Sequence, residues 1–285
     1  ATANMYENVT LQNRKFSGNS SVHVDGENSV FNLCGGVIQD CKEGFWSYAG
    51  AVRVDNQATF NMSSGEIRNC EGGEGGGVHV SNATFVMSGG IISGCEAPTN
   101  NGGGLYADNS TIEISDGTIS GCKGVWGGGL YAENSSTITI SGGTISGCTV
   151  GAGGGLFVDS STIRISGGTI NGCVTSDTGY GGGLYAKNST LNITGGTIEN
   201  NKAAYGGGVA LIGVTTFEKP ITNWTVIGNK AYKTNTGTGY IGGGIYLENG
   251  SMDVSDGSNK IYNNTADGHG ADICLEGGAS IKLPN

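Results

Sequence analysis

Aromatic side chains recur along this sequence at a spacing that would suit the binding of sugar rings. Four of them each stand directly after Gly-Gly-Gly-Leu: Tyr106, Tyr131, Phe157 and Tyr185. Five more lie in the segments that precede such glycine-rich starts: Trp46, Trp126, Tyr180, Tyr205 and Tyr240. Aromatic faces pack on sugar rings while nearby Asn and Asp hold the hydroxyl groups. The pattern predicts an exposed binding edge for a glycan or a host surface protein, although stacked rings could also serve only to stabilise a parallel sheet.

Catalytic patterns are weaker than the aromatic one. Gly268-His269-Gly270 resembles a fragment of the Gly-His-Gly motif of polygalacturonases, but the Asn-Thr-Asp, Asp-Asp and Arg-x-Lys segments of that family are missing. Asp108, Glu133 and Asp159 hold equivalent turn positions and would form at most a weak cation site. No carboxylate pair is singled out for glycosidase chemistry. We therefore expect no enzyme activity, metal or cofactor, and keep a polysaccharide lyase or glycoside hydrolase as the alternative.

A short row of threonines suggests a further, minor alternative. Thr118, Thr144 and Thr169 hold one equivalent position and would form a ladder like those of ice-binding surfaces. Charged residues at Glu66 and Glu199 interrupt the same region. Because a flat regular face needs more repeats than this, ice binding remains a minor alternative.

The cysteines also follow a fixed spacing. Six of the eight occupy one equivalent position, which Asn fills in other copies: Cys41, Cys70, Cys95, Cys122, Cys148 and Cys173. Side chains in a parallel stack point the same way, so neighbours would not bridge, and a ladder does not converge on a metal. The spacing predicts a column of free, buried thiols.

Composition narrows the class of protein. Glycine accounts for 56 of 285 residues, but only 3 are proline and 13% are charged, which excludes collagen and argues against disorder. The net charge is −10 and the sequence has no basic run, so it offers no positively charged surface for nucleic acid. No apolar stretch is long enough to span a bilayer, so we expect no membrane insertion of this segment.

The elements that must position the aromatic residues follow from an internal repeat of roughly 26 residues. The copy at 127–148 contains three short alternating segments, 130–132, 137–141 and 144–146, separated by Gly or Asn-Ser. Alternation with period two indicates strands, and glycine allows sharp turns between them. Three strands and three turns make one triangular coil. The sequence predicts an all-β, right-handed parallel β-helix of about ten coils, with one domain over residues 1–285.

The alternation also predicts which side chains face inward. In the second segment the pairs include Phe60/Met62, Ile112/Ile114, Ile138/Ile140 and Ile163/Ile165. One coil buries too little apolar surface to fold alone, so stacking must create the core.

Two motifs carry a family resemblance. Phe16-Ser17-Gly18-Asn19 matches the Phe-x-x-Asn motif of the chlamydial polymorphic outer-membrane proteins, and the Gly-Gly-Gly starts resemble that family's Gly-Gly-Ala-Ile motif. The repeat is also similar to β-helix regions of large adhesin-like surface proteins of gut and oral bacteria. It departs from the motif where Cys replaces Asn in six coils. The resemblance implies an exported bacterial protein, secreted or at the cell surface, that acts as an adhesin or a rigid stalk. Because the chain stops just after the repeat restarts at 273–278, we expect an excerpt of a longer protein.

Overall fold

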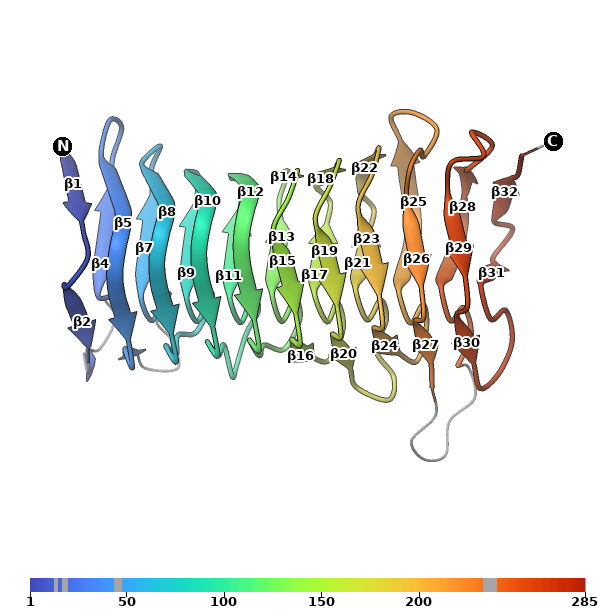
Figure 1. The fold of residues 1–285 in the computed structure, drawn as a ribbon, viewed down its shortest axis with the longest axis horizontal. Coiled ribbons are helices and arrows are strands. Elements are labelled where there is room, and N and C mark those ends of the chain that lie inside the picture. Colours follow the sequence, from blue (N-terminus) through green and yellow to red (C-terminus); the bar gives the residue numbers. More distant parts are fainter. Residues whose placement is uncertain (13–14, 17–19, 44–47, 233–239, 285) are drawn as a thin grey trace.

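The computed structural model describes residues 1–12, 15–16, 20–43, 48–232 and 240–284. Within these ranges the chain forms β-strands and no helix. All strand pairings are parallel, and successive coils lie side by side along one long axis (Figure 1). The predicted parallel β-helix is confirmed. No helix in the described part of the chain is long and apolar enough to cross a membrane.

Ten strands form the first face of the coils, one strand for each coil. In chain order they are β4 (Val22–Asp25), β7 (Val52–Asp55), β9 (Val78–Ser81), β11 (Leu105–Asp108), β13 (Leu130–Glu133), β17 (Leu156–Asp159), β21 (Leu184–Lys187), β25 (Val209–Phe217), β28 (Ile245–Asp253) and β31 (Ile273–Glu276). Leu105 is opposite Leu130, and Leu130 is opposite Leu156. The sequence-derived register is therefore correct.

The second and third faces are continuous in some coils and divided in others. Early coils use β1 (Thr2–Met5), β2 (Thr10–Gln12), β5 (Val30–Gln39), β8 (Thr59–Arg68), β10 (Thr84–Ser93) and β12 (Thr111–Ser120). Later coils use β14 (Thr137–Ile140), β15 (Thr144–Ser146), β18 (Thr162–Ile165), β19 (Thr169–Asn171), β22 (Thr190–Ile193), β23 (Thr197–Glu199), β26 (Thr225–Ile227), β29 (Lys260–Tyr262) and β32 (Ser280–Lys282). The bend inside β12 falls at Gly117, whose φ of +99° explains the glycine there.

A fourth, very short strand was not predicted. Pairs of residues form these strands, which follow the coil-closing Cys or Asn in every case except β3: β3 (Lys15–Phe16), β6 (Lys42–Glu43), β16 (Thr149–Val150), β20 (Val174–Thr175), β24 (Lys202–Ala203), β27 (Lys230–Ala231) and β30 (Thr265–Ala266). Two residues are too few to show an alternation in sequence. These strands run close to the glycine-rich starts: a Cβ on Gly207 would lie 2.5 Å from the carbonyl oxygen of Lys230 in β27. This close approach of two backbones explains why the repeat begins with glycine.

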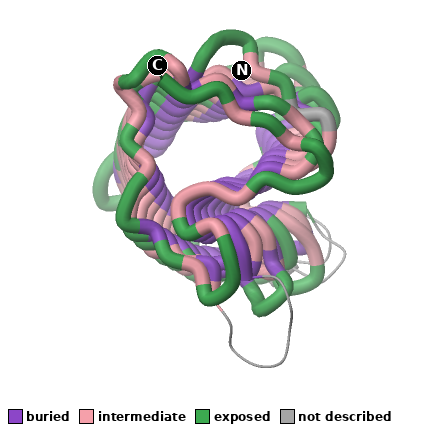
Figure 2. Tube along the Cα trace, turned by 90° about the vertical axis from the view of Figure 1, so that its right-hand side faces the viewer, coloured by how far each residue is buried: buried purple, intermediate pink, exposed green. Residues whose placement is uncertain are grey.

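The interior of the coil is apolar, as the alternation predicts. Ile112, Ile138 and Ile163 are fully buried in register, and buried residues line the inner wall of the tube (Figure 2). Phe60 stacks between Phe31 and Phe85, with ring centroids 5.3 and 5.0 Å away. Each such side chain contributes about 1.5–3 kcal/mol when fully buried.

The coil-closing column is also confirmed. The six column cysteines are buried, and none of the eight cysteines forms a disulfide. Asn201 and Asn229 continue the column. The Asn201 side-chain Oδ1 accepts a hydrogen bond from the Cys173 N–H at 2.9 Å, and its Nδ2 donates to the Ile170 carbonyl at 3.0 Å. One structural position therefore holds Cys in six consecutive coils and Asn in the coils that follow. Asn19 of the Phe-x-x-Asn motif lies outside the described residues.

The predicted threonine ladder is present. Thr118, Thr144 and Thr169 are in register, and Thr197 and Thr225 extend the row by two coils. Ice binding by this row stays a minor hypothesis.

Candidate functional site

The four repeat-start aromatic residues form one stack on the outside of the first face. Tyr106 pairs with Tyr131, Tyr131 with Phe157, and Phe157 with Tyr185. Successive ring centroids are 5.6, 5.1 and 4.5 Å apart. The prediction that this stripe is exposed is wrong, because the four side chains are only 3–8% accessible. The segments preceding the glycine runs fold over the rings and make a second apolar cluster outside the coil.

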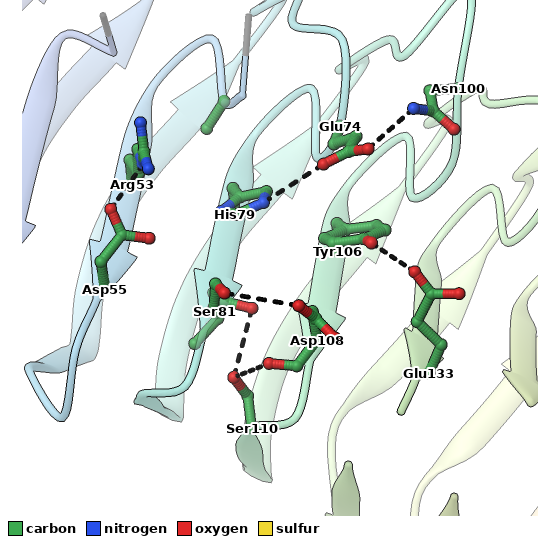
Figure 3. A network of polar contacts seen from close by, with 12 residues as sticks. Arg53, Asp55, Glu74, His79, Ser81, Asn100, Tyr106, Asp108, Ser110 and Glu133 are labelled. Atoms are coloured by element: carbon green, nitrogen blue, oxygen red, sulfur yellow. Dashed lines mark hydrogen bonds and ion pairs between the residues drawn. The ribbon is translucent and has the colours of Figure 1, made fainter. Parts of the chain in front are cut away.

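Carboxylates anchor the hydroxyl groups of this stack. The hydroxyls of Tyr106 and Tyr131 both donate to Glu133, the latter at 3.0 Å (Figure 3 shows the Tyr106 bond). Burial raises the pKa of Tyr131, and the negative charge of Glu133 raises it further. Asp108 accepts from the Asn134 amide at 2.8 Å. The acidic row proposed as a weak cation site therefore serves as hydrogen-bond acceptors along the first face.

The aromatic residues of the preceding segments differ in exposure. Trp126 is 45% accessible, whereas Tyr240 is buried. Tyr180 and Tyr205 are half-buried and stack on each other with centroids 4.6 Å apart. Trp46 lies outside the described residues. The structure thus leaves Trp126 as the most exposed ring among the described members of the predicted edge.

Among the coils whose glycine runs begin at 127, 153, 181 and 206, one lacks an aromatic ring at the position directly before the glycine run. The backbone N–H of Gly127 donates to Ala152, that of Gly153 to Tyr180, and that of Gly181 to Tyr205. Ala152 is therefore equivalent to Trp126 in the coil before and to Tyr180 in the coil after. Two coil spacings separate these rings by roughly 10 Å. The missing ring leaves a hollow between them.

This hollow, which we call the aromatic pocket, has a volume of about 330 Å³. It is lined by Trp126, Gly151, Ala152, Phe157, Asp159, Ser176, Thr178, Gly179, Tyr180, Tyr185 and Lys187. Trp126 stacks on Phe157 at 5.7 Å, and Tyr180 stacks on Tyr185 at 5.5 Å, so the second apolar cluster holds both walls. The Lys187 ammonium lies 3.4 Å from the Asp159 carboxylate. Apolar walls with a few polar groups are the usual makeup of a small-ligand site.

Four of the nine aromatic residues predicted from sequence line this pocket: Trp126, Phe157, Tyr180 and Tyr185. Tyr106 and Tyr131 belong to the buried stack, and Tyr205 supports Tyr180 from behind. Sequence reasoning missed Ala152 as the residue that opens the pocket. The available signal was Gly-Ala-Gly-Gly-Gly at 151–155, where the neighbouring copies have Trp or Tyr.

A broader hollow of about 990 Å³ lies between the segments at 216–220, 249–253 and 277–282, which include the ends of β25 and β28 and the strand β32. Its aromatic lining is limited to Phe217, and most of its other lining residues are polar or glycine. Without stacked rings it provides no platform comparable to the aromatic pocket.

Two polar clusters lie nearer the N-terminus. His23, Asp25 and Asp55 bring possible metal-ligand atoms within 4.8 Å of one another, but the Arg53 guanidinium already lies 2.5 Å from the Asp55 carboxylate and balances its charge. His79 is buried in the aromatic row and lies 3.4 Å from Glu74 (Figure 3). Arg53 and Asp55 form an ion pair within β7, and His79 of β9 contacts Glu74 of the segment before it.

The fold is that of a β-helix. Its coils are parallel and in register, each coil contributes one strand to the first face, and an apolar column faces inward. The family model described as "Right handed beta helix region" matches residues 50–231, a span that includes the aromatic pocket. The chain belongs to this family. No curated protein and no solved structure is significantly similar to the chain.

Proposed function

We propose that this chain is a non-catalytic module of an exported bacterial surface protein and that it binds carbohydrate in the aromatic pocket. The observation that carries the proposal is the absence of a ring at Ala152 between Trp126 and Tyr180, which leaves aromatic walls open to solvent. When a ligand binds to accessible aromatic residues in a concave site, the free-energy cost is small and apolar contact is gained.

The polar groups of the pocket suit the hydroxyl groups of a sugar. Asp159 can accept and Lys187 can donate, while Ser176 and Thr178 offer hydroxyls that can do both. The volume of about 330 Å³ is near the lower end for small-ligand sites, which favours one or two sugar rings over a long chain. The rod of stacked coils would present this pocket on a stiff support, as an adhesin or stalk requires.

A single lining carboxylate favours binding over catalysis. Asp159 is the one carboxylate among the described lining residues. Glycoside hydrolysis in most families needs two carboxyl groups at a defined separation, one as acid and one as base or nucleophile. The enzyme alternative predicts release of reducing ends from a polysaccharide, whereas the binding module predicts none.

A glycan array with four proteins tests the proposal: the natural chain, Trp126→Ala, Ala152→Trp and Tyr262→Ala. Trp126→Ala removes a wall, and Ala152→Trp fills the pocket without removing a ring. Tyr262 is an exposed aromatic residue that does not line the pocket, so its variant is the matched control. We expect glycan binding by the natural chain and the control, and loss of it in both pocket variants. An unchanged profile in Ala152→Trp, or no binding by any of the four, would contradict the proposal.

Surface location needs its own measurement. Antibody labelling of intact cells of the source organism should detect the protein, and protease treatment of intact cells should remove the signal. A signal found only after lysis would contradict export.

A further inference from the structure

We propose that the aromatic pocket selects sugars that carry a protonated amine, because four aromatic rings and a carboxylate converge there in a strongly acidic chain. This inference rests on the proposed carbohydrate binding and specifies the chemical class of the ligand. It is carried by the faces of the rings, by the charges around them and by the position of one lysine.

The rings provide the first part of the argument. Trp126, Phe157, Tyr180 and Tyr185 all contribute to the lining. Phe157 and Tyr185 meet at 87°, so the two stacked pairs, Trp126 on Phe157 and Tyr180 on Tyr185, present walls in different orientations. The face of an aromatic ring carries negative electrostatic potential and attracts ammonium groups, most strongly for Trp. Phe157 already stacks on Tyr131 and Trp126, and Trp126 is the most accessible of the four rings, so an amine that enters this pocket would meet chiefly the indole of Trp126.

The charges provide the second part. Asp159 lines the pocket, and Asp177 stands between the lining residues Ser176 and Thr178, whereas Lys187 is the one cation of the described lining. Asp159 and Lys187 balance each other within the lining, so the excess of negative charge comes from the neighbouring Asp177 and from the whole chain, which carries −10. In agreement, the pKa of Tyr185 is raised to about 12, first by burial and then by Tyr180, Asp159 and Glu248. An acidic sugar would be repelled here, and an amino sugar attracted.

Lys187 shows how the amine would be held. Its ammonium lies 3.4 Å from the Asp159 carboxylate, and its side chain is 44% accessible. The chain's own amine thus occupies the position that a ligand amine would take beside Asp159. Exposed ion pairs of this kind are weak, so a ligand amine that also meets the rings can displace Lys187. Lys187 therefore competes with a ligand amine for the Asp159 carboxylate. Removal of the Lys187 ammonium should strengthen the binding of a cationic ligand.

Calorimetry with two matched ligands tests the inference. Glucosamine oligomers and N-acetylglucosamine oligomers share the ring and the linkage but differ in the charge of the nitrogen. At slightly acidic pH we expect the natural chain to bind the glucosamine oligomer about tenfold more tightly, equivalent to ~1.4 kcal/mol. Lys187→Met should tighten that binding by a further threefold or more. Asp159→Asn should weaken it.

Lys42→Met is the matched charge control, because Lys42 pairs with Glu71 and does not line the pocket. It should leave both affinities unchanged. Equal affinity for the two oligomers, or weaker glucosamine binding in Lys187→Met, would overturn the inference. If the array reveals other glycans that depend on Trp126 while glucosamine oligomers do not bind, the inference fails and the proposed function stands. If no glycan of any charge binds, both fail.

Discussion

Ala152 pairs with Trp126 across neighbouring coils, and its methyl group stands where the coils on either side carry an aromatic ring. The surrounding stack remains continuous, because Phe157 and Tyr185 lie behind the gap in contact with each other. A single small residue between Trp126 and Tyr180 therefore creates the pocket without disturbing the coils.

Filling this gap should stabilise the fold. In Ala152→Tyr the new ring can stack between Trp126 and Tyr180, and an aromatic pair contributes about 0.5–1.5 kcal/mol beyond its buried area. We expect a higher free energy of unfolding by about this amount, measured by urea denaturation. Ala152→Ser, which adds no ring, is the control. A destabilised Ala152→Tyr protein would indicate that the pocket is too narrow for the ring.

Removing the shared carboxylate of the tyrosine stack should destabilise the protein. Glu133 accepts hydrogen bonds from both Tyr106 and Tyr131, and hydrogen bonds to charged groups contribute about 1.5–3 kcal/mol each before solvent screening. Glu133 is partly accessible, so Glu133→Ala should cost about 1–2 kcal/mol after that discount. Glu113→Ala, at an exposed position of β12, should change stability little. Equal stabilities of the two variants in denaturant titration would refute this role.

The asparagine part of the coil-closing column should tolerate truncation less well than the cysteine part. Asn229 is buried, accepts from the Asn201 N–H at 2.9 Å and donates to the Ile198 carbonyl at 2.9 Å. Asn229→Ala leaves these buried groups without partners, at roughly 2–4 kcal/mol. Cys148→Ala removes only a small apolar side chain, at roughly 1 kcal/mol. The comparison fails if thermal or denaturant unfolding ranks the two variants in the opposite order.

The thiols should differ sharply in reactivity. Cys34 and Cys274 are partly accessible, whereas the six column cysteines are buried. Alkylation of the native protein followed by mass spectrometry should label those two faster, and denaturant should expose all eight as free thiols. Recovery of a disulfide between any two column cysteines would contradict this arrangement.

Ionisation of Tyr185 should be coupled to stability at alkaline pH. Burial, followed by the charges nearby, raises its pKa from 10.0 to about 12 in the folded chain. The folded state holds the Tyr185 proton more tightly than the unfolded state. The contribution of this proton to the free energy of unfolding is therefore complete below about pH 10 and is lost as the pH rises towards 12. Ultraviolet absorbance titration of the natural chain and Tyr185→Phe should differ by one late-ionising phenol. A difference that titrates near pH 10 would argue against burial of this hydroxyl.

The sequence by itself determined the coil, its register and its closing column. Leu105, Leu130 and Leu156 recur with the same neighbours in each repeat, and period-two alternation can place them only on the inner side of a strand. The burial of Cys122 and Asn229 followed from the same repeat, because equivalent residues of a solenoid lie above one another.

Only the tertiary structure decided what the outward side chains meet. Alternation assigns Tyr131 to the outside of its strand, but it carries no information about the segment that covers that strand, so the stripe is buried rather than exposed. The pocket depends on how far Trp126 and Tyr180 are held apart by a coil that has Ala152 between them. That distance is set by the stacking of coils and the path of the covering segments, which are contacts between repeats and not a property of any one of them.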